Sequence, residues 1–204
     1  MTTLDKRAET VTSVHDLIAR RHSPRAFDPN RLIEQDKLLS MLEAARWTAS
    51  SSNLQPWRFI VARKQDSAEF DKLLSVIKEG NIPWAKHAGA LVLGVVHKYR
   101  REDVLNRHAS HDLGQSIAQM VLQALDHDIY ARQMGGFYPD KARELYSIPE
   151  EYEPFTAIAF GYKTSDLSHL TDAHREAEMN RRERLTLDQL VFGGSWAQTA
   201  DFID

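Results

Sequence analysis

The chain has 204 residues, enough for one domain to build its own hydrophobic core, and it contains no cysteine. The missing cysteine excludes disulfides, thiolate metal sites, iron–sulfur ligation and cysteine nucleophiles, and it permits a reducing cytoplasm. With 26 Lys and Arg against 29 Asp and Glu, the formal net charge of −3 gives no overall attraction to nucleic acid or anionic lipid, so any anion site must be local.

Neither a targeting segment nor a membrane span is expected. The first residues, MTTLDKRAETVTSV, carry early acids and no apolar core, unlike a secretory signal or an anchor. The longest apolar run, residues 88–96, is too short to cross a bilayer and suits a buried strand. We therefore expect a soluble, cytoplasmic protein without membrane contact.

Four helices are expected from apolar residues at helical spacing. Pro24 must end the first, so the basic residues around it lie at a helix exit. The fourth is apolar around much of its circumference, which favours a central position or a subunit interface. The four helices span residues 14–21, 34–49, 66–78 and 110–128.

Three strand patterns alternate with these helices, at residues 57–62, 88–96 and 155–161. A Gly-rich turn is expected over 132–139 and a short helix over 141–146.

The C-terminal part differs in composition from the rest. Residues 166–183 are dense in charge and poor in apolar side chains, which predicts an exposed or extended arm. Helical spacing returns over 186–191, and Phe192 and Trp196 then need a surface to pack on. We therefore expect a single domain, 1–204, whose residues 165–204 form an arm that reaches a partner subunit.

A first polar cluster, Arg21-His22-Ser23-Pro24-Arg25-Ala26-Phe27-Asp28, combines guanidinium donors with a hydroxyl. This donor set suits a dianionic phosphate. The alternative is an ordinary basic helix C-terminus, where cations complement the helix dipole.

A second polar cluster, Ser50-Ser51-Ser52-Asn53-Leu54-Gln55-Pro56-Trp57, leads into the first strand. If the segment is extended, the carboxamides of Asn53 and Gln55 point the same way and can read the edge of a planar heterocycle. The alternative is an ordinary turn with local side-chain hydrogen bonds. Together, the two clusters look like the two ends of a nucleotide-type cofactor site.

Six motifs in order along the chain resemble those of the nitroreductase family of FMN-dependent oxidoreductases. Besides the two clusters, the resemblance rests on Asp112-Leu-Gly-Gln, Met134-Gly-Gly-Phe137, Phe160-Gly-Tyr162, and Arg182-Glu-Arg184 before Leu187-Asp-Gln-Leu-Val191. The chain departs from the family pattern at Ala49, where a proline is common.

The resemblance implies an α+β sandwich with a mainly antiparallel sheet flanked by helices, and an intertwined homodimer with one FMN in each interface cleft. Arg21, His22, Ser23 and Arg25 would hold FMN from its phosphate towards the pyrimidine. Ser51, Asn53 and Gln55 would contact it, the last two beside the ring. Gly135 and Gly136 of the partner would present N–H groups near N5, and Arg182 and Arg184 would return to the phosphate.

The implied activity is transfer of hydride from NADH or NADPH through FMN to a small electron-poor acceptor such as a nitroaromatic or quinone. Because the cofactor performs the difficult step, no catalytic acid or base need be visible. Dehalogenating, flavin-destroying and dehydrogenating branches, and a non-catalytic flavin-binding protein, remain alternatives. Residues 78–87 and 99–108 are the candidates for a cleft lid that would separate them.

Other candidates are weaker. His108 and His111 are three residues apart but lack a carboxylate at metal-site spacing, so no metal is expected. The three serines at 50–52 lack the frame of a serine nucleophile. Trp84 and Trp196 suit packing, or the lining of an interface cleft. The basic segments lack interleaved aromatic residues, which disfavours nucleic-acid binding.

Overall fold

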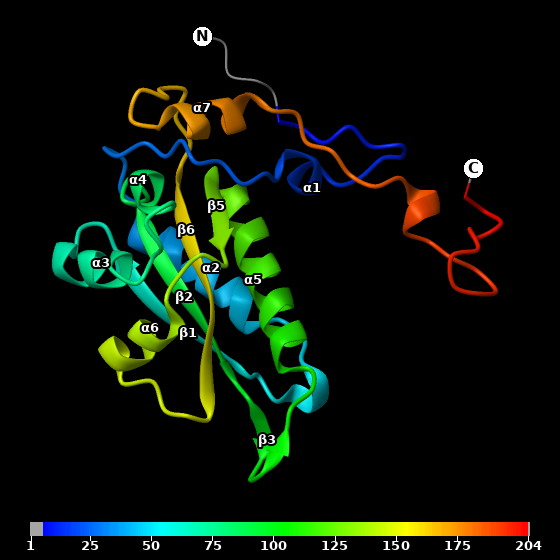
Figure 1. Cartoon of the computed structure of the whole chain (residues 1–204), viewed down its shortest axis with the longest axis horizontal. Helices are drawn as coiled ribbons and strands as arrows, with labels where there is room; N and C mark the ends of the chain where they lie inside the picture. Colours follow the sequence, from blue (N-terminus) through cyan, green and yellow to red (C-terminus); the bar gives the residue numbers. More distant parts are fainter. Residues whose placement is uncertain (1–5, 204) are drawn as a thin grey trace.

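The computed structural model describes residues 6–203 and is built around a four-stranded antiparallel sheet (Figure 1). The strand order is β1-β2-β6-β5, so the apolar run predicted as a buried strand lies inside the sheet. The strands are β1 (Trp57–Arg63), β2 (Ala90–His97), β6 (Tyr152–Tyr162) and β5 (Ile129–Met134). The predicted α+β architecture with a mainly antiparallel sheet is confirmed.

Both faces of the sheet are covered by helices. The longer helices α2 (Gln35–Arg46) and α5 (Ala109–Asp126) pack on one face. The side chain of Trp57, in β1, belongs to the same hydrophobic cluster. The shorter α3 (Ser67–Leu74), α4 (Ile82–Ala85) and α6 (Pro139–Tyr146) cover the other face. Because neighbouring residues of a strand point to opposite faces, a strand buried on both sides must be apolar where it is buried, as β2 is from Ala90 to Val96.

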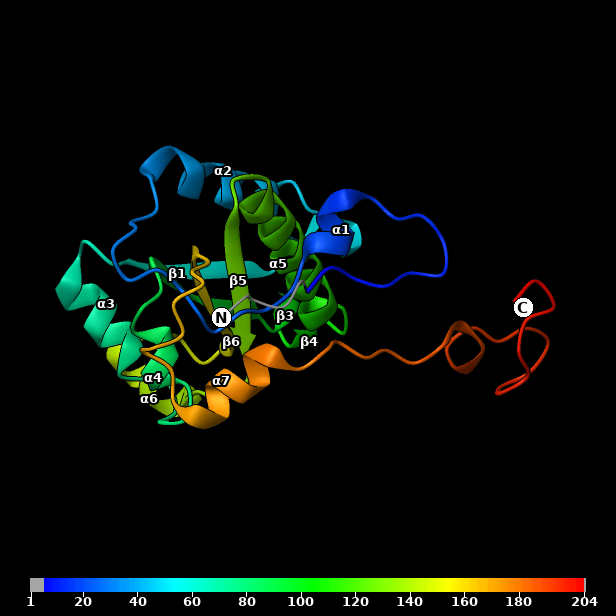
Figure 2. The same ribbon diagram turned by 90° about the horizontal axis from the view of Figure 1, so that it is seen from above.

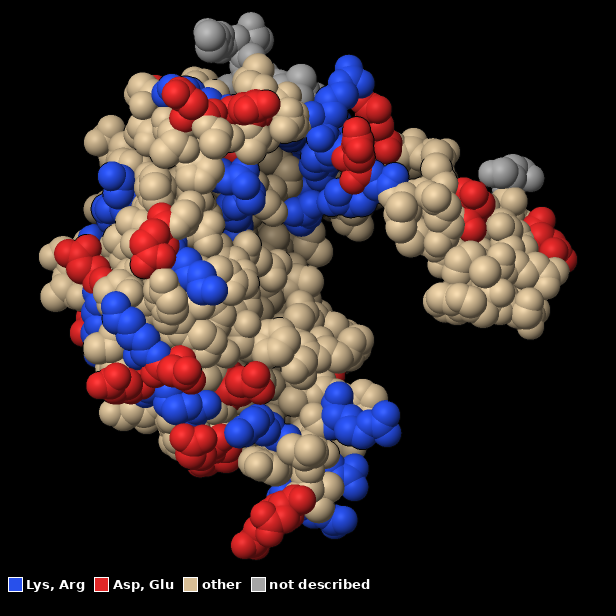
Figure 3. Space-filling view, viewed as in Figure 1, with Lys and Arg blue, Asp and Glu red and all other residues tan. Residues whose placement is uncertain are grey.

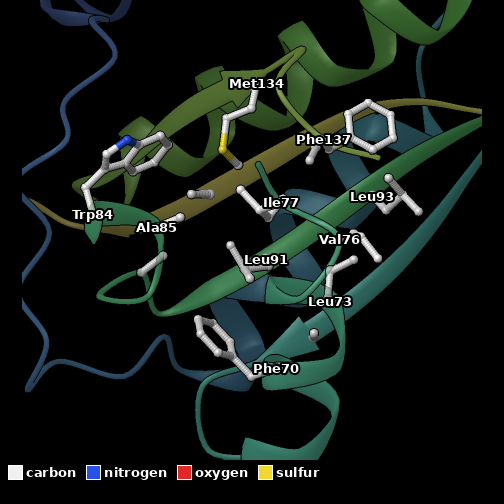
Figure 4. Packing of buried hydrophobic residues seen from close by; sticks show 14 of the residues in the cluster. Phe70, Leu73, Val76, Ile77, Trp84, Ala85, Leu91, Leu93, Met134 and Phe137 are labelled. Atoms are coloured by element: carbon white, nitrogen blue, oxygen red, sulfur yellow. The ribbon is translucent and has the colours of Figure 1, made fainter. Parts of the chain in front are cut away.

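The core under the shorter helices is drawn in Figure 4. Phe70 and Leu73 of α3 approach Leu91 and Leu93 of β2, and Trp84 of α4 lies at one end of the cluster. Each fully buried side chain of this size contributes about 1.5–3 kcal/mol of hydrophobic stabilisation.

Helix α5 is the central helix of the fold. Its buried side chains include Leu113, Ile117, Met120 and Leu125, which explains why its sequence is apolar around more than one stripe. The chain then turns directly into β5. Figure 1 shows α5 running along the sheet, from the region beside the β3 hairpin to the side of the molecule where α1 lies.

The remaining elements are short. Helix α1 (Asp16–Arg20) ends before Pro24, as expected, and a 3₁₀ turn (Ser51–Asn53) follows α2. Strands β3 (Tyr99–Arg101) and β4 (Val104–Leu105) form a small hairpin. Each candidate lid region contains a short element: α4 lies in 78–87 and the β3–β4 hairpin lies in 99–108.

The C-terminal part combines a helix with a projecting tail. Helix α7 (Asp172–Met179) follows β6, and a 3₁₀ turn (Leu187–Gln189) lies further along. Figure 2 shows the chain after α7 leading away from the body. Phe192 and Trp196 pack on each other, with ring centroids 5.2 Å apart. Several large apolar side chains of the tail are exposed: Leu185, Leu187, Leu190, Trp196 and Phe202.

Two sequence-based expectations are wrong in part. Residues 132–134 belong to β5 and not to the Gly-rich turn; the polar Arg132 and Gln133 hid the end of a strand that itself was not predicted. Residues 166–183 are not all extended, because Thr171 caps α7 by accepting a hydrogen bond from the His174 N–H.

Candidate functional site

A cavity of about 220 Å³ lies where the end of α1, the segment that follows it and the region after α7 meet. Seven of its lining residues are Lys or Arg and one is Glu. In Figure 3, Lys and Arg side chains gather at the junction of body and tail, above a hollow in the surface. The lining residues are Lys6, Arg21, His22, Ser23, Arg25, Arg132, Ala177, Glu178, Asn180, Arg181, Arg182 and Arg184.

The cavity wall is held together mainly by arginines that donate to backbone carbonyls. Arg182 donates to the carbonyls of Arg21, at 2.6 Å, and Ala19, at 3.1 Å, and so attaches the tail to the segment after α1. Arg132 of β5 donates to the Ser23 carbonyl. Since a carbonyl is neutral, these bonds orient the guanidinium groups without cancelling their charge.

One carboxylate enters the cavity. Glu178, on α7, accepts a hydrogen bond from the Arg25 N–H at 2.8 Å, and the Arg25 guanidinium lies 3.7 Å from the same oxygen. Arg21 makes a weaker contact, donating to Ser23 Oγ at 3.3 Å.

Burial and mutual repulsion shift the pKa values of the cations. Burial, with Arg25 as the next cause, lowers the pKa of Arg132 to about 10. Burial and then the charge of Arg184 lower the pKa of Arg21. Burial lowers the pKa of His22 to about 4, and Lys163 adds to that effect. All three shifts show that positive charge is crowded and poorly hydrated here, which an anion would relieve.

These residues fit a phosphate dianion. Arg supplies paired donors in the geometry of phosphate oxygens, and Ser23 adds a hydroxyl. The structure therefore brings together the site residues expected from the first cluster and from the tail: Arg21, His22, Ser23, Arg25, Arg182 and Arg184.

The second cluster is not part of this cavity. The Ser51 N–H donates to Asp112, near the start of α5, at 3.1 Å. In contrast, Arg20 of α1 donates to Asp128, just beyond the end of α5, at 3.3 Å. The helical stretch from Asp112 to the end of α5 at Asp126 rises by fourteen residues, which at 1.5 Å each is about 21 Å. Ser51 thus lies near the start of α5, whereas the contact of α1 lies beyond its end, and none of Ser51, Asn53 and Gln55 lines the cavity.

The loop of the second cluster also differs in shape from the expected extended segment. Asn53 and Gln55 have positive φ angles, and the Gln55 carboxamide donates to the Asn53 carbonyl at 3.0 Å. The two carboxamides therefore do not form a matched pair on one surface.

Gly135 and Gly136 follow β5, three and four residues beyond the cavity residue Arg132. The Gly136 carbonyl accepts from the Lys78 N–H and the Asn81 side chain, at 3.0 and 3.2 Å. A Cβ at Gly136 would lie 2.6 Å from Asn81, whereas one at Gly135 would meet nothing within 4 Å. The backbone at Gly135 is open to approach from outside.

Sequence reasoning missed several cavity residues, among them Lys6, Arg132 and Glu178. Lys6 and Glu178 belong to charged segments in which nothing marked them, and Arg132 was assigned to a turn. The period-two alternation of β5, with Tyr130, Arg132 and Met134 on one face, is the signal that could have found Arg132.

Residues 6–203 provide neither a membrane-spanning helix nor a cluster of metal ligands. No helix in this part of the chain is long and apolar enough to cross a membrane. Within the same residues, no three His, Cys, Asp or Glu side chains converge as a metal site would require.

The fold and the cavity define an α+β protein with a cationic site suited to an anionic ligand. The chain belongs to the nitroreductase family, whose model matches residues 18–162. It is 35% identical, over 193 residues, to the CLA biosynthesis enone reductase of Lactiplantibacillus plantarum, covering 76% of this chain and 88% of that protein. It is also 32% identical, over 146 residues, to an uncharacterized 15.4 kDa protein of Mycolicibacterium smegmatis, covering 68% and 97%.

Among solved structures, the chain resembles a crystal structure described as an oxidoreductase containing FMN. The TM-score is 0.88 and the sequence identity 32%, with 98% of this chain and 100% of the other covered.

Proposed function

We propose that the chain is an FMN-dependent oxidoreductase that takes hydride from NADH or NADPH and passes it to an electron-poor acceptor such as a nitroaromatic or quinone. The observation that carries this proposal is the cavity of about 220 Å³, with seven cations and one carboxylate, in a member of the nitroreductase family. The similar oxidoreductase containing FMN supports the choice of anion.

Bound FMN would supply the hydride chemistry itself. Arg21, Arg182 and Arg184 would bind its phosphate, with Ser23 adding a hydroxyl donor. Arg25, held beside Glu178, would add positive charge that favours the reduced, anionic flavin electrostatically. The chain's contribution is therefore binding, orientation and charge, and no side chain needs to act as a dedicated acid or base.

A second copy of the chain would complete the site. Ser51, Asn53 and Gln55, which do not line the cavity of their own chain, would contribute to the site if the loop of one protomer faces the cavity of the other. The exposed apolar side chains of the tail, including Leu190 and Trp196, favour such pairing. Because Gly135 follows Arg132 so closely, the copy that carries the cavity would also supply Gly135 and Gly136.

A conjugated enone is a second candidate acceptor. The 35% identity to the CLA biosynthesis enone reductase favours it over the dehalogenating and dehydrogenating alternatives. Like a nitro group, an enone is electron-poor and accepts hydride.

The first test is the visible spectrum of protein purified without added cofactor. We expect flavin absorbance, or uptake of added FMN, and bleaching by NADH or NADPH without oxygen. Reoxidation by a nitroaromatic, a quinone and an enone would then rank the acceptors. A protein that neither contains nor takes up FMN contradicts the proposal; one that binds FMN but is not reduced is a flavin-binding protein.

A further inference from the structure

Three residues of the loop between α2 and β1 adopt backbone conformations that are unfavourable for residues with a Cβ. The φ angles are 52° at Ser52, 54° at Asn53 and 48° at Gln55. Such residues persist where surrounding contacts hold them, and they concentrate at functional sites. The contacts of this loop therefore bear on its role.

The loop fixes its own backbone and leaves Asn53 available. Asn53 is exposed, and its carboxamide has no hydrogen-bond partner among residues 6–203. The Gln55 N–H donates to Ser50 Oγ at 3.0 Å, and Arg58 donates to the Gln55 carbonyl at 3.0 Å. The strain is thus maintained by neighbours while one side chain is presented to solvent.

Asp112 anchors the loop from the body of the protein. It lies in the first turn of α5, is 2% exposed, and is the one buried acidic residue among residues 6–203. Its Oδ2 accepts the Ser51 N–H at 3.1 Å. One turn further along α5, Ser116 donates to the Ala45 carbonyl at 3.0 Å. Helix α5 therefore holds both the end of α2 and the loop that follows.

Stabilisation of the α5 dipole is the alternative role for Asp112, because a carboxylate in the first turn of a helix is favourable. That effect needs the negative charge but no bond to Ser51. Burying a carboxylate is costly unless hydrogen bonds compensate it, so the burial and the bond point to the contact and not to the charge alone.

We propose that Asp112 is a positioning residue that, through the Ser51 N–H, holds the strained loop in the shape that presents Asn53 to the flavin. This inference rests on the proposed FMN function.

The test compares Asp112→Ala, Asp112→Asn and the matched control Asp126→Ala, an exposed carboxylate in the last turn of the same helix. FMN affinity is measured by titration of apoprotein, and the spectrum and reduction potential of the bound flavin at saturating FMN. We expect Asp112→Ala to weaken FMN binding at least tenfold and to shift both flavin properties. Asp112→Asn, which keeps an oxygen acceptor, should stay within about threefold of wild type, and Asp126→Ala should match wild type.

A second pair of variants addresses the same hydrogen bond if Asp112→Ala does not fold. Ser51→Pro removes the N–H at the first position of a 3₁₀ turn, where proline is tolerated, and Ser50 before it is already extended. Ser51→Ala keeps the N–H. The proline variant should lose FMN affinity at least tenfold relative to the alanine variant.

Several outcomes would overturn the inference. Equal defects in Asp112→Ala and Asp112→Asn would assign the role to charge, and wild-type behaviour of Asp112→Ala or of Ser51→Pro would remove it. If wild-type protein takes up no FMN, the proposed function fails as well, whereas FMN uptake with no difference among the variants overturns this inference alone.

Discussion

The buried His22 should make the folded protein sensitive to mild acid. Its side chain is 7% exposed, its Nδ1 donates to the Arg20 carbonyl at 3.0 Å, and its ring lies 5.0 Å from Tyr130. Burial, reinforced by the charges of Lys163, Arg182 and Lys6, lowers its pKa to about 4 from the ordinary value of 6.5. The unfolded chain therefore binds this proton more readily than the folded chain.

Acid should accordingly favour unfolding. Above pH about 6.5, His22 does not lower the free energy of unfolding. As the pH falls from 6.5 towards 4, the unfolded chain takes up the His22 proton first, and the free energy of unfolding decreases. The gap between the two pKa values corresponds to a limit of about 3.4 kcal/mol at lower pH, of which about 2 kcal/mol is present at pH 5.

The measurement is the free energy of unfolding in urea at pH 7 and pH 5, at one protein concentration, for wild type and His22→Asn. Asparagine keeps a donor near the position of Nδ1 but does not titrate, so its loss between the two pH values should be about 2 kcal/mol smaller. His111→Asn, on the exposed face of α5, controls for removal of a histidine and should follow the wild-type curve. Equal pH slopes for His22→Asn and wild type would refute the reasoning.

Three further predictions concern the cavity, the core and the tail. Arg21→Ala should weaken FMN binding about tenfold or more in a titration, because it removes a charged phosphate donor, whereas Arg46→Ala on exposed α2 should not. Gly161→Ala should lower the free energy of unfolding by about 1–3 kcal/mol, since its Cβ would lie 2.8 Å from Phe27; Gly80→Ala has open space and should be neutral. Deleting residues 181–204 should yield monomers in sedimentation if the tail supports a dimer; unchanged dimers would contradict that role.

Elements with strong periodicity could be predicted from the sequence. The apolar run of β2 and the many apolar positions of α5 reflect burial on more than one side, so local pattern and final environment agree. Strand β5 escaped prediction because its last residues include Arg132 and Gln133. Arg132 is polar because it serves the cavity, and the function of a residue can override the pattern of its strand.

The candidate site was predicted from the order of motifs along the chain and not from periodicity. Motif order predicted Arg21 and Arg184 as parts of one site although 162 residues separate them in the sequence, and both residues line the same cavity. It did not identify Glu178, which contacts the backbone N–H and the guanidinium of Arg25 and carries no local signature. Motif order also could not show that the loop with Asn53 lies near the start of α5, away from the cavity. That placement depends on how α5 is packed in the fold.

The separation of the two clusters makes binding and oligomerisation one thermodynamic problem. If each FMN needs the cavity of one protomer and the Asn53 loop of the other, its binding free energy is available only to the dimer, and FMN must strengthen dimerisation by the same factor by which dimerisation strengthens FMN binding. Apoprotein should therefore dissociate on dilution at concentrations at which the FMN complex stays dimeric. A dimer whose dissociation constant is independent of FMN would show that a single protomer binds the cofactor, and the loop beyond α2 would then need another role.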